Sequence, residues 1–159
     1  MAAEESKFSG MNVEIKTPSD LKRKDIIMWQ EGDDVKLIEV SVVTKSKPGK
    51  HGSAKYNIQG VNLANSKNFE FTEGAKSNLH ICTFQKNPCM LVSINHDMDE
   101  FIVFNEATFE NATFSVKMIP AEALEKIEKV KEASPDAEIK FNLVDTPYLV
   151  NVTDMIVNL

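Results

Sequence analysis

Two alternating runs of apolar residues flank a Pro-Gly turn, and together they predict a long β-hairpin. Before the turn, every second side chain is apolar, at Ile38, Val40 and Val42. After the turn the same alternation resumes, at Ala54, Tyr56 and Ile58. A period of two residues is typical of a strand that buries one face. Pro48 presets the backbone for a β-turn, and Gly49 suits the positive φ that a type II turn requires.

The turn between these strands is unusually basic. Five lysines and no acidic residue lie between Glu39 and Glu70: Lys45, Lys47, Lys50, Lys55 and Lys67. Lys50 follows the bend directly, and Gly52 adds a second permissive backbone position. This concentration of charge indicates an anionic partner. The alternative is an ordinary lysine-rich hairpin tip, which explains the turn and the charge without any function.

Composition places the chain among globular proteins. Its 159 residues are 42% hydrophobic, which is enough for a core and too high for global disorder. No apolar run approaches the length of a membrane span, so we expect no membrane contact. Two cysteines, Cys82 and Cys89, do not form a disulfide framework and suit a reducing compartment. We therefore expect a cytoplasmic protein.

Motifs of catalysis and cofactor binding are missing from the sequence. It contains no nucleophile elbow, no phosphate-binding loop and no dinucleotide fingerprint. His80 and Cys82, with Cys89 further on, do not have the spacing of a zinc site. The sequence therefore predicts a protein that is not an enzyme and that holds no metal or cofactor.

Charge is unevenly distributed and indicates two modules. Residues 17–81 carry ten basic and eight acidic side chains, a net charge of +2. Residues 82–159 carry six basic and thirteen acidic side chains, a net charge of −7. We therefore predict a flexible N-terminal arm over residues 1–17, a first domain over 18–81 and a second over 82–159.

The second module shows strands, one helix and further strands. Alternation predicts strands around three apolar sets: Met90, Val92 and Ile94; Phe114, Val116 and Met118; Ile139, Phe141 and Leu143. A helix is expected from Pro120 to Ser134, with one apolar face at Ala123, Ile127 and Val130. A strand follows at Tyr148, Val150 and Val152. This order fits a five-stranded OB barrel. We expect core positions for Trp29, Phe101, Phe104, Phe109 and Phe114.

The residues from Ser46 to Lys55 resemble the modification loop of translation factor 5A of eukaryotes and archaea, the relative of bacterial elongation factor P. The central Gly49-Lys50-His51-Gly52 carries the resemblance, together with Ala54-Lys55. Upstream, residues 21–25 lead into Ile26-Ile27-Met28 as they do at the first strand of that family. Pro48 and Ser53 are closer to the archaeal loop, because the eukaryotic one commonly has Thr and His there.

The resemblance implies an all-β fold of two small barrels, an N-terminal SH3-like barrel and a C-terminal OB-fold barrel. It implies that deoxyhypusine synthase and deoxyhypusine hydroxylase convert Lys50 to hypusine with an aminobutyl group from spermidine. It further implies a factor that binds the ribosome beside the P-site tRNA and reaches the acceptor end of peptidyl-tRNA. There it promotes peptide-bond formation at polyproline-type stalls and assists elongation and termination. Loop and RNA contacts are expected from Lys47, Pro48, Gly49, His51, Gly52, Ser53 and Lys55.

Two rival functions remain open at this point. One is a self-assembling structural protein on the same two-barrel scaffold, as in fungal Woronin-body proteins, which lack the modifiable lysine motif. The other is a general RNA-binding module that uses unmodified lysines. The intact motif around Lys50 favours the translation factor over the first rival.

Overall fold

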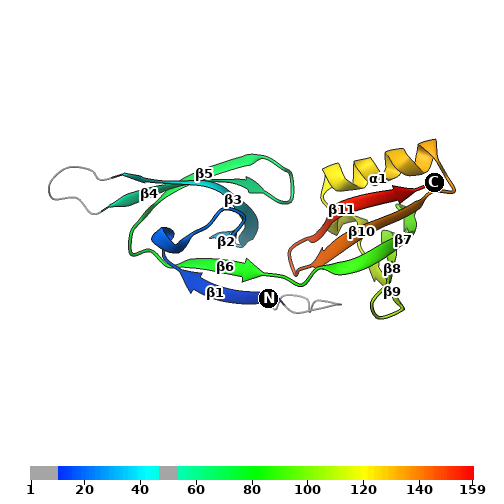
Figure 1. Ribbon diagram of the computed structural model, residues 1–159, viewed down its shortest axis with the longest axis horizontal. Coiled ribbons are helices and arrows are strands. Elements are labelled where there is room, and N and C mark those ends of the chain that lie inside the picture. Colours follow the sequence, from blue (N-terminus) through cyan, green and yellow to red (C-terminus); the bar gives the residue numbers. More distant parts are fainter. Residues whose placement is uncertain (1–10, 47–53) are drawn as a thin grey trace. The chain divides into compact units, whose positions relative to one another are not determined.

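The computed structural model describes residues 11–46 and 54–159, and these form two compact units (Figure 1). The first unit spans Asn12–Thr83, and the second contains Phe84–Leu159. The boundary therefore falls two residues after the one predicted from charge. The predicted arm over residues 1–17 needs a larger correction, because Asn12–Lys16 form a strand, β1. Val13 and Ile15 alternate with polar residues there, which is a strand signal that the predicted arm overlooked, and β1 pairs with the distant β6 although both side chains are exposed.

The first unit is a six-stranded antiparallel sheet. Its strands are β1 (Asn12–Lys16), β2 (Ile26–Glu31), β3 (Asp34–Ser46), β4 (Lys55–Asn62), β5 (Asn68–Gly74) and β6 (Leu79–Thr83), and a 3₁₀ helix covers Pro18–Asp20. The hydrogen-bonded order is β1-β6-β2-β3-β4-β5. Its main buried cluster consists of Ile27, Ile38, Val40, Ile58, Leu79 and Ile81.

This sheet curls so that strands far apart in the hydrogen-bonded order make contact through aromatic side chains. The ring of Trp29 on β2 lies 4.3 Å from that of Phe71 and 5.7 Å from that of Phe69, both on β5. Within the described strands no backbone ladder joins β1 to β5. The expected barrel is therefore a curled sheet, and Trp29 is a partly buried member of its core.

A β-bulge in β3 changes which side chains face the core. The pairing register with β4 shifts between Val40 and Val42. An extra residue at such a point reverses the alternation beyond it. Val42 is therefore 49% exposed, and Val43 packs against the core opposite Ile58. The prediction that Ile38, Val40 and Val42 share one buried face was wrong at its last member.

The second unit is a five-stranded antiparallel sheet packed with one α-helix (Figure 1). Its elements are β7 (Asn87–Asn95), β8 (Glu100–Asn105), β9 (Glu110–Phe114), a 3₁₀ helix (Val116–Met118), α1 (Ala121–Ala133), β10 (Glu138–Asp145) and β11 (Val150–Asn158). The strand order is β11-β10-β7-β8-β9. The expected fold class, mainly β with one short α-helix, is confirmed, and in place of each expected barrel the described strands form one sheet. Among the described residues, no helix is long and apolar enough to cross a membrane.

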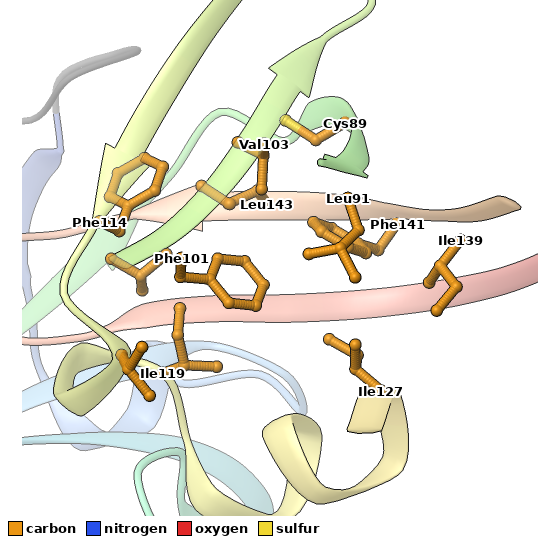
Figure 2. Packing of buried hydrophobic residues seen from close by; sticks show 12 residues of the cluster. Cys89, Leu91, Phe101, Val103, Phe114, Ile119, Ile127, Ile139, Phe141 and Leu143 are labelled. Atoms are coloured by element: carbon orange, nitrogen blue, oxygen red, sulfur yellow. The ribbon is translucent and has the colours of Figure 1, made fainter. Parts of the chain in front are cut away.

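The core of this unit gathers side chains from both the sheet and the helix. Figure 2 shows Phe101 and Phe141 near Ile127, which is the fully buried residue of α1. The helix begins after Pro120 and ends at Ser134, as predicted. Ile139, Phe141 and Leu143 are buried on β10, which is the predicted face.

Other predicted faces were wrong, and each error has a local cause. On β7 the buried residues are Cys89 and Leu91 rather than Met90 and Val92, and a register shift follows Leu91. Residues 116–118 form a 3₁₀ helix instead of a strand, because the Ser115 hydroxyl accepts a hydrogen bond from the Lys117 amide at 3.2 Å.

The four phenylalanines expected in the core fall into two groups. Phe101 and Phe114 are buried, as expected. Phe104 is half-buried on the opposite face of β8, and Phe109 is 76% exposed in the turn after that strand. Alternation alone predicted that the Phe109 side chain points into the core, but Phe109 lies in the turn after β8 and not on a strand.

Candidate functional site

The predicted site lies at the open end of the β3–β4 hairpin. The last described pair of this hairpin joins Ser46 to Lys55, so residues 47–54 make the connection. Seven of the predicted site residues lie outside the described residues: Lys47, Pro48, Gly49, Lys50, His51, Gly52 and Ser53. Lys55 is described, and it is an exposed member of the final pair.

The hairpin extends well beyond the core that stabilises its base. β3 is 13 residues long, and its last three side chains, Thr44 to Ser46, are all exposed. At ~3.3 Å per residue, these three residues carry the pairing roughly 10 Å past Val43. β5 continues alongside β4 to the pair between Lys55 and Gly74, so the projecting stem has three strands (Figure 1). Three paired strands hold the attachment points of the connection in a fixed register.

The two lysines nearest the connection lie on opposite faces of the stem. Lys45 pairs with Tyr56, and its ammonium lies 6.0 Å from the centre of that ring. Lys55 pairs with Ser46, whose hydroxyl donates a 3.5 Å hydrogen bond to the Lys55 carbonyl oxygen. A positive charge therefore stands on each side of the stem end, which suits contact with an anion that surrounds the tip.

Acidic residues lie within the stem on β5, although none lies between Glu39 and Glu70 in the sequence. Glu73 pairs with Tyr56, and Glu70 pairs with Gln59 further from the connection. The Glu70 carboxylate accepts hydrogen bonds from Asn57 Nδ2 at 2.8 Å and from Gln59 Nε2 at 3.4 Å. The shorter of these bonds comes from Asn57, which lies nearer the connection than Gln59, so the amide donors hold the Glu70 charge within the stem. The acid-free run seen in the sequence is not acid-free in space.

Gly60 is a residue that the sequence analysis missed. A β-carbon at this position would lie 2.6 Å from the Glu39 carbonyl oxygen and 2.6 Å from Ile38 Cγ2. Only glycine allows β3 and β4 to approach this closely at the base of the stem. A glycine inside an apolar alternation is the signal that could have identified it.

Among the described residues outside the stem, few have the reactivity or the arrangement of a catalytic or metal site. Burial raises the pKa of both cysteine thiols to about 11, which makes Cys82 and Cys89 poor nucleophiles. His80 is exposed on β6, and His96 contacts the Glu128 carboxylate of α1. No group of three or more His, Cys, Asp or Glu residues in the described ranges is placed to hold a metal ion.

The comparisons with known proteins show that this chain is similar to translation factors. Residues 13–77 match the family model described as translation initiation factor 5A-like, N-terminal. This segment includes the hairpin stem and the whole connection with Lys50. The segment is therefore similar to the N-terminal domain of translation initiation factor 5A-like proteins, which confirms the resemblance found in the sequence. Proteins of this family are translation factors rather than enzymes.

Relatives extend the similarity beyond this domain. Translation initiation factor 5A of Methanosarcina acetivorans is 27% identical over 123 residues, which are 77% of this chain and 86% of that protein. Its counterpart in Methanosarcina barkeri is 24% identical over 95 residues, 60% of this chain and 70% of that protein.

Two solved structures share the fold of both units. An initiation factor 5A family protein from Naegleria fowleri has a TM-score of 0.67 at 21% identity and covers 90% of this chain and 97% of its own. The factor from Methanococcus jannaschii has a TM-score of 0.61 at 19% identity, with coverages of 91% and 95%.

Proposed function

We propose that this protein is a ribosome-binding translation factor that acts through a hypusine formed on Lys50. One observation carries the proposal. Position 50 lies in an eight-residue connection, 47–54, on a three-stranded stem inside the segment that matches the initiation factor 5A-like family model. The lysine motif and the described stem together fit a long cation presented beyond the body of the domain.

Modification would lengthen the Lys50 side chain without changing the stem. Deoxyhypusine synthase would form a bond between the lysine nitrogen and the aminobutyl group of spermidine, whose bond to the secondary nitrogen breaks so that 1,3-diaminopropane leaves. Deoxyhypusine hydroxylase would then oxidise one carbon of the new chain to an alcohol, with molecular oxygen as the oxidant. The product has two amine nitrogens on one long chain, and each ammonium is a compact charge with several hydrogen-bond donors.

Such a side chain suits the acceptor end of peptidyl-tRNA at the P site. Contacts to phosphate and sugar oxygens position RNA without reading its sequence. Ordering a misplaced tRNA end restores the attack geometry for peptide-bond formation, and well-oriented reactions gain up to roughly 7–11 kcal/mol from positioning. Slow polyproline sequences should benefit most, and elongation and termination in the cytoplasm should depend on the same contacts.

Neighbouring residues have supporting roles in this proposal. Lys47 and Lys55 would contact RNA on either side of the tip, and Lys45 adds a charge on the opposite face of the stem from Lys55. Pro48, Gly49, Gly52 and Ser53 would set the backbone, and His51 would support the tip. No separate cofactor is required.

Replacement of the modified lysine is the direct test. Lys50→Arg keeps the charge but cannot accept the aminobutyl group, so it should abolish rescue of polyproline synthesis in a reconstituted translation assay. The matched control is Lys67→Arg, an exposed lysine in the β4–β5 turn, which should leave rescue unchanged. Both variants should keep the unfolding temperature of the parent. Full rescue by Lys50→Arg would refute the mechanism.

Mass spectrometry of the Lys50 peptide from native cells separates this proposal from its rivals. A mass increase equal to hypusine supports the factor, and an increase equal to deoxyhypusine shows that hydroxylation does not follow. An unmodified lysine, in a cell that modifies other copies of the factor, would favour a general RNA-binding module. Large assemblies in sedimentation together with unmodified Lys50 would favour the structural protein.

A further inference from the structure

Three consecutive basic residues form a tight turn just before β2. Lys22, Arg23 and Lys24 are all exposed, and we call them the basic turn. The Asp25 amide donates a 3.1 Å hydrogen bond to the Lys22 carbonyl oxygen, which closes a β-turn. Lys24 is its third residue and has a φ of +79°, where glycine is the residue that fits without strain. Such strain persists only where the surrounding structure enforces it, and it gathers at functional positions.

Hydrogen bonds to β3 and to Asp25 hold the backbone of the basic turn in place. The Lys24 amide donates to the Val40 carbonyl oxygen at 2.8 Å, and the Val40 amide donates to the Asp25 carbonyl oxygen at 2.8 Å. The Asp25 carboxylate accepts a 2.9 Å hydrogen bond from the Lys22 amide. Because the backbone is fixed before any ligand arrives, binding at the turn orders only side chains.

The basic turn has no ion-pair partner among residues 11–46 and 54–159. The adjacent Asp25 is already engaged, because its carboxylate lies 3.3 Å from Lys16 Nζ. Asp20 and Glu39 lie close to the turn, in the chain and on β3, and neither belongs to those ion pairs. Solvent ions therefore balance the three positive charges, and an anionic ligand would release them on binding.

The basic turn lies where the hairpin stem begins. β2 starts at Ile26, which pairs with Glu39, and the turn bonds to the next residue of β3, Val40. Beyond this point β3 continues to Ser46 without β2 beside it. At ~3.3 Å per residue, the strand from Val40 to Ser46 covers roughly 20 Å. The basic turn and the connection that contains Lys50 therefore attach to the two ends of the stem.

We propose that the basic turn binds phosphates of the RNA that the hairpin tip contacts, so that this RNA is held at both ends of the stem. The inference rests on the proposed function, because it takes the RNA at the tip as its ligand. A nucleic-acid backbone carries a phosphate at every nucleotide and can reach both points. The guanidinium of Arg23 matches the geometry of phosphate oxygens, and the two lysines add point charges.

The salt dependence of RNA binding is the test. The probe is a short RNA duplex with a single-stranded 3′ end, added to the unmodified full chain. Loss of one phosphate contact should lower the slope of log affinity against log salt by about one, so Arg23→Gln should show this change with any RNA sequence. The control is Lys67→Gln, an exposed lysine of the same unit that lies beyond the opposite end of β4 from Lys55. Its slope should equal that of the parent.

Variants at Lys24 separate binding from stability. Lys24→Gly relieves the positive φ, so it should raise the unfolding temperature and yet lower the salt slope. Lys24→Arg keeps the charge and should keep the slope. Parental RNA binding by both Arg23→Gln and Lys24→Gly would overturn the proposal. Equal slopes for Arg23→Gln and Lys67→Gln would also overturn it, as would displacement of the RNA by polyglutamate at equal charge concentration.

This test and the test of Lys50 can fail separately. RNA binding is measured on the unmodified chain, so it does not depend on hypusine. Full rescue by Lys50→Arg, with a lowered slope for Arg23→Gln, would refute the hypusine mechanism and leave the phosphate contact. Lost rescue by Lys50→Arg, with parental slopes for the turn variants, would remove only the basic turn as an RNA contact.

Discussion

The two units differ in the size of their buried cores and in how far their strands extend beyond those cores. Among the described residues, fifteen buried hydrophobic side chains belong to the second unit, one of them on its helix, whereas nine belong to the first unit. The first unit instead extends β3 to Ser46, where the side chains are exposed. Net charge differs as well, since residues 17–81 carry +2 and residues 82–159 carry −7.

This difference shows what a hairpin that extends beyond its core requires for stability. Exposed paired strands bury little apolar area, so they add reach without adding much hydrophobic stabilisation. The curled sheet compensates at its base through the Trp29, Phe69 and Phe71 rings and through the close approach at Gly60. The second unit needs no such device and has the larger core. We therefore expect the first unit to unfold more readily than the second.

The largest effect is expected when an aromatic ring is removed from the larger core. Phe101 is fully buried beside Phe141, and Phe101→Ala should destabilise the second unit by about 3–5 kcal/mol. The only tryptophan, Trp29, lies in the first unit, so its fluorescence reports that unit alone. Denaturant unfolding should therefore show an earlier circular-dichroism transition and an unchanged fluorescence transition. A parallel shift in both signals would mean that the units unfold as one.

The two cysteines provide one probe for each unit. Burial raises the pKa of Cys82 and Cys89 from 9.0 to about 11, so at pH 8 each folded thiol should react about a hundredfold more slowly than an exposed one. The raised pKa favours the protonated thiol of the folded state. Its contribution to stability is therefore complete below pH 9 and is lost as the pH rises toward 11.

Alkylation of the two thiols in increasing denaturant ranks the stability of the two units. Cys82 belongs to the first unit and Cys89 to the second, so mass spectrometry should find Cys82 labelled at the lower denaturant concentration. The single-cysteine variants Cys82→Ala and Cys89→Ala identify each signal. Earlier labelling of Cys89 would reverse the order of stability that the cores predict.

A smaller effect is expected at the base of the hairpin stem. Gly60→Ala places a β-carbon against the Glu39 carbonyl and Ile38, and it should destabilise the first unit by about 1–3 kcal/mol. Gly74→Ala is the matched control in β5, since its nearest neighbour would be Ser77 Oγ at 3.8 Å. Trp29 fluorescence should show the loss for Gly60→Ala only. Equal destabilisation by the two variants would show that the close approach of β3 and β4 does not depend on glycine at position 60.

Local patterns predicted the elements whose signals lie within a few residues. The helix after Pro120, the inward Tyr56 and Ile58, and the buried face of β10 all follow from spacing and turn chemistry. Faces beyond a bulge could not be predicted this way. An extra residue in β3 or β7 is set by the partner strand, and the alternation that predicted Val42 and Val92 inside contains no record of it.

The sequence by itself determined the mainly β fold, the two modules of unlike charge and the lysine motif at residues 47–55. Each of these features depends on residues that are close together in the chain. Only the tertiary structure decided that Glu70 and Glu73 lie within the stem, that Gly60 must lack a side chain and that Phe109 lies outside. Those features depend on which strands pair and in what register. Pairing joins residues far apart in the chain, so it is set by the packing of the whole unit.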